Sequence, residues 1–394
     1  MFFNMHNLVI AHRGEVWEEF KKVGADAAGS AIMAPKALHR LVKIYDLAPR
    51  QANIIKQEML GKGGDAAVTR GTVDSSVEKT DVLLMGTEKQ YRAVIKKLRM
   101  QPFKLAALAE QLKQTLDNLN GRQPRELICR DKKLTLGERT LVMGILNVTP
   151  DSFSDGGSYD NIDAAIACAR RLVDEGADII DLGGESTHPG YEPISVEEEL
   201  DRVIPVLQVL VREINLPVSV DTTKASVARR ALEVGAHIIN DQWSLRADRN
   251  MASVVAEYQV PLVMMHNQRG TEYRDLMGDM VRFFRESIAM AEQAGIVREN
   301  IIIDPGIGFG KTVQHNLEAL RRLRELDGLG LPVLLGTSRK SLVGKTLDLP
   351  PDQRVEGTGA TVALGIANGA DIVRVHDVKE MVRVVRMTDA VVRG

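Results

Sequence analysis

The sequence predicts an α/β protein in which a (β/α)8 barrel, also called a TIM barrel, follows a smaller α/β domain. From about residue 140 onward, short apolar runs rich in β-branched residues alternate with longer amphipathic runs. This alternation is typical of parallel strands that are buried on both faces and joined by helices. Eight short runs in about 255 residues match the strand number and size of such a barrel. An open doubly wound sheet is the alternative, but it usually has a glycine-rich turn after its first strand.

The first 138 residues lack this alternation, so we predict two domains, 1–138 and 139–394. Two runs in the first domain have the composition of strands and three have that of helices. The strands are expected at 39–47 and 80–86, and the helices at 49–64, 87–100 and 104–119. Pro49 near the start of one helix and Gly61 near its end are typical of helix termini. The segment 120–124, Asn-Gly-Arg-Gln-Pro, has the composition of a linker.

The expected barrel strands are the eight short apolar runs. They cover residues 141–148, 177–183, 217–222, 237–242, 261–266, 300–306, 332–338 and 371–376. After the first strand, an apolar stripe predicts a helix that is capped by Asn161 and ends at Gly176. The sequence Ser-Val-Glu-Glu, from Ser195 to Glu198, is typical of a capping box and marks the start of the next helix.

Composition limits the classes of partner. The net charge is −2 and aromatic residues make up 4% of the chain, so neither nucleic acid nor an anionic membrane is expected. No run approaches the roughly 18 apolar residues of a membrane span, and the first apolar run is too short for a signal peptide. Cys129 and Cys168 offer neither a disulfide framework nor a metal-site spacing. We therefore expect a cytoplasmic protein.

Polar residues stand where the predicted barrel strands end. They are Asn147, Asp181, Asp221, Asn240, Asp241, His266, Asn267, Asp304, Arg374 and His376. In these barrels the active site lies at the carboxyl ends of the strands. Burying so many polar groups is costly unless they are hydrogen-bonded. The sequence therefore predicts a ligand with many donors and acceptors at this end.

Two segments near the end of the chain suggest that the ligand is an anion. Arg374 and His376 are two residues apart on a predicted strand, so their side chains lie on the same face. The segment 338–341, Ser-Arg-Lys-Ser, begins a predicted helix, where free backbone N–H groups favour anions. A cation in the barrel mouth and basic residues at a helix start both fit an anionic ligand.

Some of these residues have equally simple structural explanations. Asp221 or Asp304 alone could be a helix N-cap, and His266 alone is more simply a satisfied core histidine. The segment 304–312 does not fit the phosphate-binding loop pattern, because Pro305 stands where a glycine is required. Its glycines instead suggest a tight turn that approaches a ligand, with Lys311 facing solvent.

Seven motifs in order resemble those of the dihydropteroate synthases. They are GILNVTPDSFSDGG, DLGGESTHPG, SVDT, IND, DPGIGFGK, SRKS and RVHD, within residues 144–377. This resemblance implies a transferase of folate biosynthesis. It would join p-aminobenzoate to 6-hydroxymethyl-7,8-dihydropterin diphosphate, giving 7,8-dihydropteroate and diphosphate.

The resemblance also implies roles for individual residues. Those expected to bind the pterin are Asp221, Asn240, Asp304 and Lys340. Those expected to bind diphosphate are Thr187, Arg374 and His376, with Asn147 as a ligand of Mg2+. Those expected to bind p-aminobenzoate are Phe153, Pro189 and Ser341. The catalytic set is Asp221, Lys340, Arg374 and His376.

The implied mechanism is dissociative: diphosphate leaves first, a carboxylate stabilises the pterin cation, and the arylamine then attacks. Members of the family are typically dimers, so we expect a homodimer. Two alternatives remain at this point, a methyltetrahydrofolate–corrinoid methyltransferase and a non-catalytic pterin-binding module. Neither would need a diphosphate site and a p-aminobenzoate site together.

Overall fold

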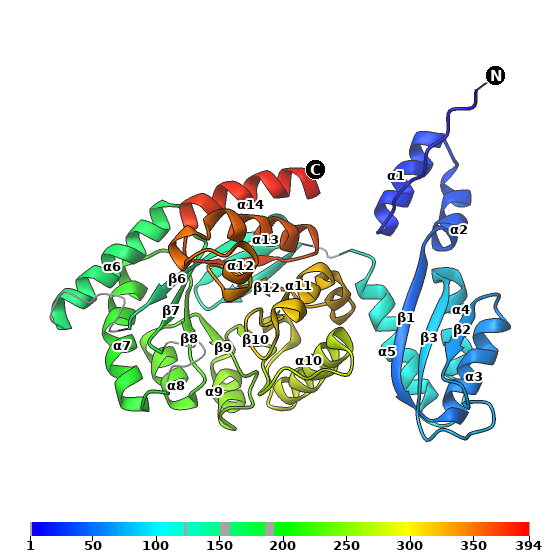
Figure 1. Ribbon diagram of the computed structural model, residues 1–394, viewed down its shortest axis with the longest axis horizontal. Helices are drawn as coiled ribbons and strands as arrows, with labels where there is room; N and C mark the ends of the chain where they lie inside the picture. The colour runs from blue at the N-terminus through cyan, green and yellow to red at the C-terminus, as the bar shows by residue number, and fades with distance from the viewer. Residues whose placement is uncertain (1, 122–123, 150–157, 186–192, 394) are drawn as a thin grey trace. The chain divides into compact units, whose positions relative to one another are not determined.

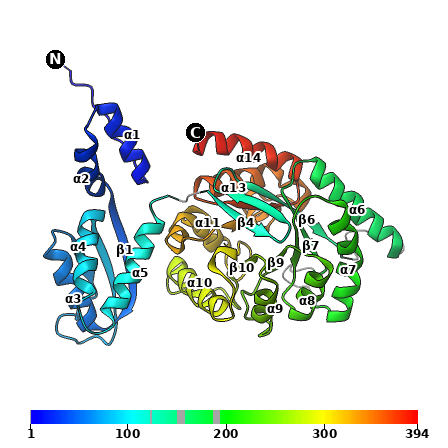
Figure 2. The ribbon, with the colours of Figure 1, turned by 180° about the vertical axis from the view of Figure 1, so that it is seen from behind.

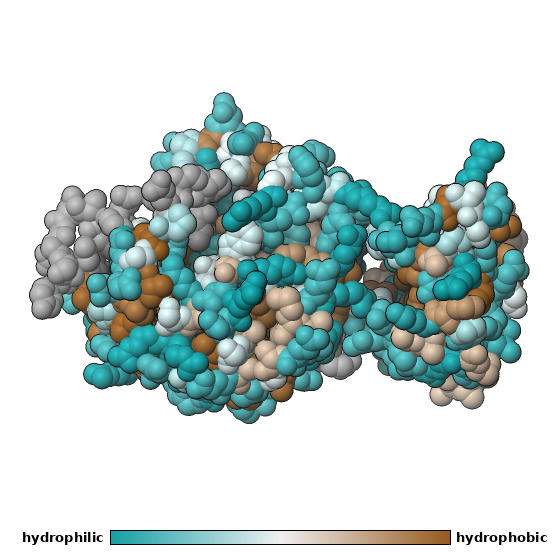
Figure 3. All heavy atoms as spheres, turned by 90° about the horizontal axis from the view of Figure 1, so that it is seen from below, coloured by the Kyte–Doolittle hydropathy of each residue, from teal (hydrophilic) through white to brown (hydrophobic). Residues whose placement is uncertain are grey.

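The computed structural model describes the chain except residues 1, 122–123, 150–157, 186–192 and 394, and the side chains of 158–161. The chain divides into two compact units. One comprises Met1–Arg122 with the short segment Gly328–Gly330, and the other comprises Gln123–Asp327 and Leu331–Gly394. Among the residues described, no helix combines the length and apolar character needed to cross a membrane. The face of the molecule in Figure 3 is mainly hydrophilic, with apolar residues exposed in small groups.

The first unit is a three-stranded antiparallel sheet, in the order β1-β3-β2, packed with helices (Figure 1). Its elements are α1 (Arg13–Val23), α2 (Ala27–Ala37), β1 (His39–Leu47), α3 (Pro49–Leu60), β2 (Asp65–Val68), β3 (Thr80–Thr87), α4 (Glu88–Leu98) and α5 (Leu105–Asn118). Alternate residues of β3 are buried, which places Val82 and Leu84 in the core with helix residues such as Tyr91. The two strands and three helices predicted here are confirmed. The helices α1 and α2 and the strand β2 were not predicted.

A two-stranded hairpin begins the second unit. It consists of β4 (Arg125–Cys129) and β5 (Lys132–Leu136). Leu127 and Leu136 are buried in one cluster with the first residues of several barrel strands, including Leu141 and Ile179. The hairpin therefore packs across the amino-terminal end of the barrel. For this reason the contacts divide the chain at 122/123, before the predicted domain boundary at 138/139.

The second unit is a closed barrel of eight parallel strands (Figures 1 and 2). In chain order the strands are β6 (Leu141–Asn147), β7 (Ile179–Gly183), β8 (Val218–Asp221), β9 (Ile238–Asp241), β10 (Leu262–Met265), β11 (Ile301–Asp304), β12 (Leu334–Leu335) and β13 (Ile372–Val375). The sheet order runs from β11 down to β6 and then through β13 to β12. A parallel bridge between Ile303 and Val333 joins the two ends of this order. The predicted barrel is confirmed, and the open-sheet alternative is wrong.

Helices surround the barrel, as Figure 2 shows from behind. The α-helices are α6 (Ser158–Asp174), α7 (Val196–Glu213), α8 (Ala225–Val234), α9 (Met251–Tyr258), α10 (Leu276–Gln293), α11 (Val313–Arg321), α12 (Ser341–Leu347), α13 (Val355–Ala367) and α14 (Val378–Val392). The 3-10 helices are η2 (Arg298–Asn300), η3 (Leu323–Leu329) and η4 (Pro351–Gln353).

Of the three helix termini predicted within the barrel, two are confirmed. Ser195 caps α7, because its side chain accepts a hydrogen bond from the Glu198 N–H at 3.1 Å. Gly176 follows α6 with φ of 101° and donates its N–H to the Val173 carbonyl at 2.9 Å. The prediction that Asn161 caps α6 is wrong, because the helical backbone already begins at Ser158.

Candidate active site

The residues predicted at the strand ends lie together at one end of the barrel. Asn147, Asp221 and Asp304 are the last residues of β6, β8 and β11. Asn240 lies one residue before the end of β9, and Arg374 is the third residue of β13. Because the strands are parallel, their carboxyl ends face the same way.

Arg374 is the centre of a hydrogen-bonded network at this end. Its Nε lies 2.6 Å from Asp181 Oδ2, and its Nη2 lies 2.9 Å from Asp221 Oδ2. Asn240 donates from Nδ2 to the same Asp181 oxygen at 3.1 Å. Gln242 donates from Nε2 to both oxygens of Asp221, at 2.9 and 2.8 Å. Asp181 had been recognised as a strand-end residue without a role, and Gln242 had not been singled out.

The two carboxylates predicted to bind a pterin are buried beside cations. Burial raises the pKa of Asp221, and the guanidinium of Arg374 opposes that rise. Burial also raises the pKa of Asp304, and the ammonium of Lys340 opposes it. Asp304 Oδ1 accepts a hydrogen bond from the Gly306 N–H at 2.7 Å. Both side chains accept hydrogen bonds in the structure, Asp221 from Gln242 and Asp304 from the Gly306 N–H.

Lys340 reaches this site across a glycine turn. Its Nζ donates to the Ile307 carbonyl and lies 4.6 Å from the centre of the Phe309 ring. A Cβ on Gly308 would lie 3.1 Å from Lys340 Cδ, so the glycine permits this close approach. Burial lowers the pKa of Lys340 to about 8, with Asp304 opposing the change. Phe309 was not predicted as a site residue. The glycines on either side of it predicted only that this segment approaches a ligand.

Lys311 is buried, so the expectation that it faces solvent is wrong. It is 9% exposed, and its Nζ lies 2.8 Å from His266 Nδ1 and 3.2 Å from the carbonyl oxygens of Gly306 and Phe309. The lysine turns inward because these three acceptors match the three donors of an ammonium. Burial lowers the pKa of Lys311 to about 7. Burial and the positive charge of Lys311 together lower the pKa of His266 to about 2. His266 is thus the satisfied core histidine that its sequence context suggested.

His376 is tied to the segment that follows β12. Its backbone N–H donates to Ser338 Oγ at 3.1 Å, and its Nδ1 lies 3.0 Å from the same oxygen. Arg339 pairs with Asp377, with 3.0 Å between Nε and Oδ2. The two segments predicted to bind an anion are therefore in direct contact. Ser341, the predicted p-aminobenzoate ligand, is the first residue of α12 and is exposed.

Three predicted residues, Phe153, Thr187 and Pro189, lie outside the residues that the structure describes. The predicted magnesium ligand Asn147 has an exposed side chain at the end of β6. Among the described residues, no three His, Cys, Asp or Glu side chains come together in a way that could hold a metal ion. A single amide oxygen fits Mg2+ only where the other ligands are phosphate oxygens and water, which is how this ion is usually bound.

A second ionic cluster lies directly before residues 186–192. Lys224 Nζ pairs with Glu185 and, at 2.5 Å, with Glu199 Oε2. The side chain of Glu199 is fully buried. Arg202 donates to the Gly184 carbonyl at 2.9 Å. These contacts fix the end of β7 against α7 and the segment after β8, and no sequence pattern had indicated them.

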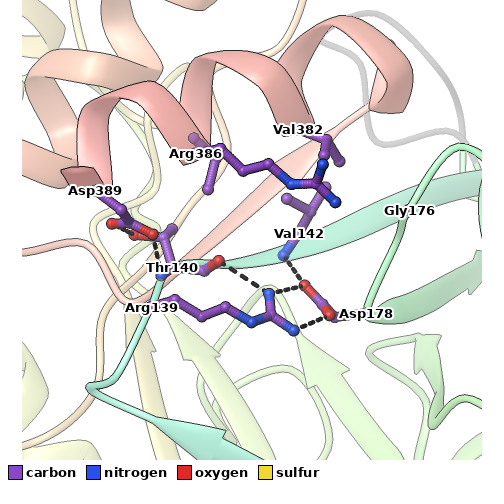
Figure 4. A pocket seen from close by; sticks show the side chains of 9 residues that line it. Arg139, Thr140, Val142, Gly176, Asp178, Val382, Arg386 and Asp389 are labelled. Carbon is purple, nitrogen blue, oxygen red and sulfur yellow. Dashed lines mark hydrogen bonds and ion pairs between the residues drawn. The ribbon is translucent and has the colours of Figure 1, made fainter.

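A pocket at the opposite end of the barrel differs from the active site (Figure 4). It lies beside Val142 near the start of β6 and beside α14. Arg139 Nη1 pairs with Asp178 Oδ2 at 2.8 Å, and the Thr140 N–H donates to Asp389 Oδ2 at 2.7 Å. These groups satisfy one another, so the amino-terminal end of the barrel serves stability.

Comparison with known proteins defines the class of enzyme. The family described as "Pterin binding enzyme" matches residues 143–376, which is more than half of the chain. The chain therefore belongs to the pterin-binding enzymes.

Individual relatives narrow this class to the dihydropteroate synthases, the transferases of folate biosynthesis that form dihydropteroate. Dihydropteroate synthase of Bacillus subtilis is 54% identical to this chain over 268 residues. The match covers 68% of this chain and 94% of the Bacillus protein. A crystal structure of dihydropteroate synthase from Clostridium difficile, in the presence of pteroic acid, has 56% identity and a TM-score of 0.65. The match covers 66% of this chain and 99% of the Clostridium chain.

A third relative extends the similarity into the N-terminal unit. A probable bifunctional folylpolyglutamate synthase/dihydropteroate synthase of Halobacterium salinarum is 42% identical over 373 residues. The match covers 92% of this chain and 44% of that protein.

Proposed function

We propose that the carboxyl end of the barrel binds 6-hydroxymethyl-7,8-dihydropterin diphosphate through Asp221, Asn240, Asp304 and Lys340. The observation that carries this proposal is the meeting of three buried acceptor side chains with one ammonium. A pterin has amino and ring N–H donors beside a carbonyl oxygen. The carboxylates and the amide suit the donors, and Lys340 suits the carbonyl.

Arg374 and His376 bind the diphosphate in this proposal, with Thr187 as a further contact. Arg374 also balances Asp181 and Asp221, so its charge is held in place before the substrate arrives. Asn147 would hold Mg2+ at the diphosphate side of the site. When bound, this ion neutralises charge that builds up on the leaving diphosphate.

p-Aminobenzoate lies beside the pterin, between Phe153 and Pro189, with its carboxylate at Ser341. The Phe309 ring, 4.6 Å from Lys340 Nζ, is an additional candidate for contact with the aromatic substrate. An aromatic ring next to an ammonium offers both an apolar surface and a positive charge, which suits a benzoate.

The reaction proceeds by dissociation. The bond between the exocyclic carbon and the diphosphate oxygen breaks first, and both electrons leave with the diphosphate. The Asp221 carboxylate stabilises the pterin cation, since preorganised charge is most effective in a buried site. The amine of p-aminobenzoate then forms the carbon–nitrogen bond and loses one proton.

The protein forms a homodimer through α13 and α14. These neighbouring helices expose Leu364, Met387 and Val391 at 56%, 66% and 71%. Met387 and Val391 are four residues apart on α14 and so lie on one face of that helix. Exposed large apolar side chains on neighbouring helices indicate an interaction surface. Sedimentation velocity should show a dimer that Met387→Glu converts to a monomer, whereas a wild-type monomer contradicts the proposal.

The deciding experiment measures diphosphate release from the dihydropterin diphosphate and Mg2+, with and without p-aminobenzoate. Diphosphate and dihydropteroate should form together, and Asp221→Ala should lower the rate by at least about 100-fold. Chelation of Mg2+ should abolish release. Full activity in Asp221→Ala, or in the presence of chelator, would refute the corresponding role.

A further inference from the structure

Asp181 is a fully buried carboxylate that accepts a hydrogen bond from the side-chain amide of Asn240. We infer that Asp181 is a positioning residue that fixes the amide of Asn240 with its oxygen towards the ligand, and thereby selects a ligand group that donates a hydrogen bond. The inference rests on the proposed contact between Asn240 and the pterin.

The side-chain amide of Asn240 can face Asp181 in either of two orientations. The two ends of the Asn240 amide have nearly the same shape, but one donates and the other accepts. The end that faces Asp181 lies 3.1 Å from its Oδ2. A carboxylate paired with a guanidinium can only accept a hydrogen bond. The Asn240 NH2 group must therefore face Asp181, which leaves Asn240 Oδ1 on the other side of the amide.

Arg374 makes this arrangement rigid. Its Nε lies 2.6 Å from the same Asp181 Oδ2 that receives the Asn240 amide. The guanidinium holds the Asp181 carboxylate in place, so the direction of hydrogen bonding is fixed from Arg374 through Asp181 to Asn240. Asp181 Oδ1 is buried and accepts no hydrogen bond within the described parts of the chain. Leaving such an oxygen unsatisfied is costly, so this carboxylate is poorly explained by stability alone.

The chemical consequence is a choice of ligand edge. With its oxygen turned outward, Asn240 accepts from an N–H or amino group and repels a lone pair. Asp221 and Asp304 are also acceptors, so the site presents acceptors at three points. It is therefore selective for a heterocycle that presents several donors on the edge it turns towards these residues.

The test removes the carboxylate at position 181 and places one at position 240. Binding of 6-hydroxymethyl-7,8-dihydropterin would be measured for wild type, Asp181→Ala, Asn240→Asp and the double variant that combines both. Asp181→Ala should weaken binding roughly 10- to 100-fold, because no acceptor then holds the Asn240 NH2 group away from the ligand. Asn240→Asp should also weaken binding, since its carboxylate meets that of Asp181. The double variant keeps the net charge and again presents only acceptors to the ligand, so it should recover most of the affinity.

Each outcome decides a different point. A double variant that binds as weakly as Asp181→Ala would overturn the inference, because Asp181 would then act through Arg374 or through folding. Asn240→Asp alone is a second test that needs no change at Asp181. If the amide only supplied an acceptor, this variant would bind as well as wild type, and that result also overturns the inference.

Two further measurements separate this inference from its premise. Normal pterin binding by Asn240→Ala would refute the proposed pterin contact itself. Weak binding by Asn240→Ala with normal binding by Asp181→Ala would refute the role of Asp181 only. In turnover, Asp181→Ala should raise KM for the pterin substrate and leave KM for p-aminobenzoate within about twofold, whereas a general loss of structure would raise both.

Discussion

Replacing Lys311 by methionine tests whether a buried ammonium makes the stability of the barrel depend on pH. Burial lowers the pKa of Lys311 from its ordinary value of 10.5 to about 7. Between these two values the unfolded chain binds more protons than the folded protein, so raising the pH stabilises the fold. The slope is about 1.4 kcal/mol per pH unit, which gives about 3 kcal/mol between pH 7 and pH 9.5. Below pH 7 the contribution no longer changes, because both states are protonated.

The assay is urea unfolding at several pH values in a Trp17→Phe background, where Trp243 is the remaining tryptophan and reports on the barrel. The unfolding free energy of the Lys311 protein minus that of Lys311→Met should rise by about 3 kcal/mol from pH 7 to pH 9.5. Lys345→Met, at an exposed position in α12, is the matched control, and its difference should stay constant with pH. A Lys311 difference that does not change with pH would refute this reasoning.

A pH profile and a substitution test two other side chains of the barrel, Lys340 and Ser195. Because the pKa of Lys340 is lowered to about 8, kcat/KM for the pterin substrate should fall above about pH 8 as the lysine loses its proton; a profile that stays flat to pH 9.5 contradicts its proposed role as a donor. Ser195→Ala removes the side chain that caps α7 and should lower the unfolding free energy by about 1 kcal/mol, whereas Ser195→Asp should retain most of it. Equal stability of all three proteins would show that this cap contributes nothing.

The barrel could be predicted because its strands repeat one physical pattern. The strands are buried and mostly apolar, and several carry polar residues towards their carboxyl ends, as in Val218–Asp221 and Ile238–Asp241. Parallel strands bring those ends together. This is why Asp221, Asn240 and Asp304 could be placed at one site from their positions in the chain alone.

The contacts within the site could not be predicted in the same way. Period-two spacing placed Arg374 on the same face as His376, but not between Asp181 and Asp221. Lys311 follows a glycine turn, and only the folded path of that turn brings its ammonium to His266 Nδ1. Such contacts depend on tertiary structure, which local patterns do not contain.

The elements missed before the barrel have a different explanation. The strands β4 and β5 are short and carry charged residues at several positions, so they lack a long apolar run. Their leucines become core residues only because the ends of other strands supply the rest of the cluster.

That hairpin has a consequence for the order of events in turnover. With β4 and β5 packed across the amino-terminal end, the proposed substrates enter and leave at the carboxyl ends of the strands. In the proposed arrangement the pterin lies deeper than p-aminobenzoate, so the pterin substrate binds first. Steady-state kinetics should therefore be ordered, with p-aminobenzoate unable to bind productively ahead of the pterin substrate.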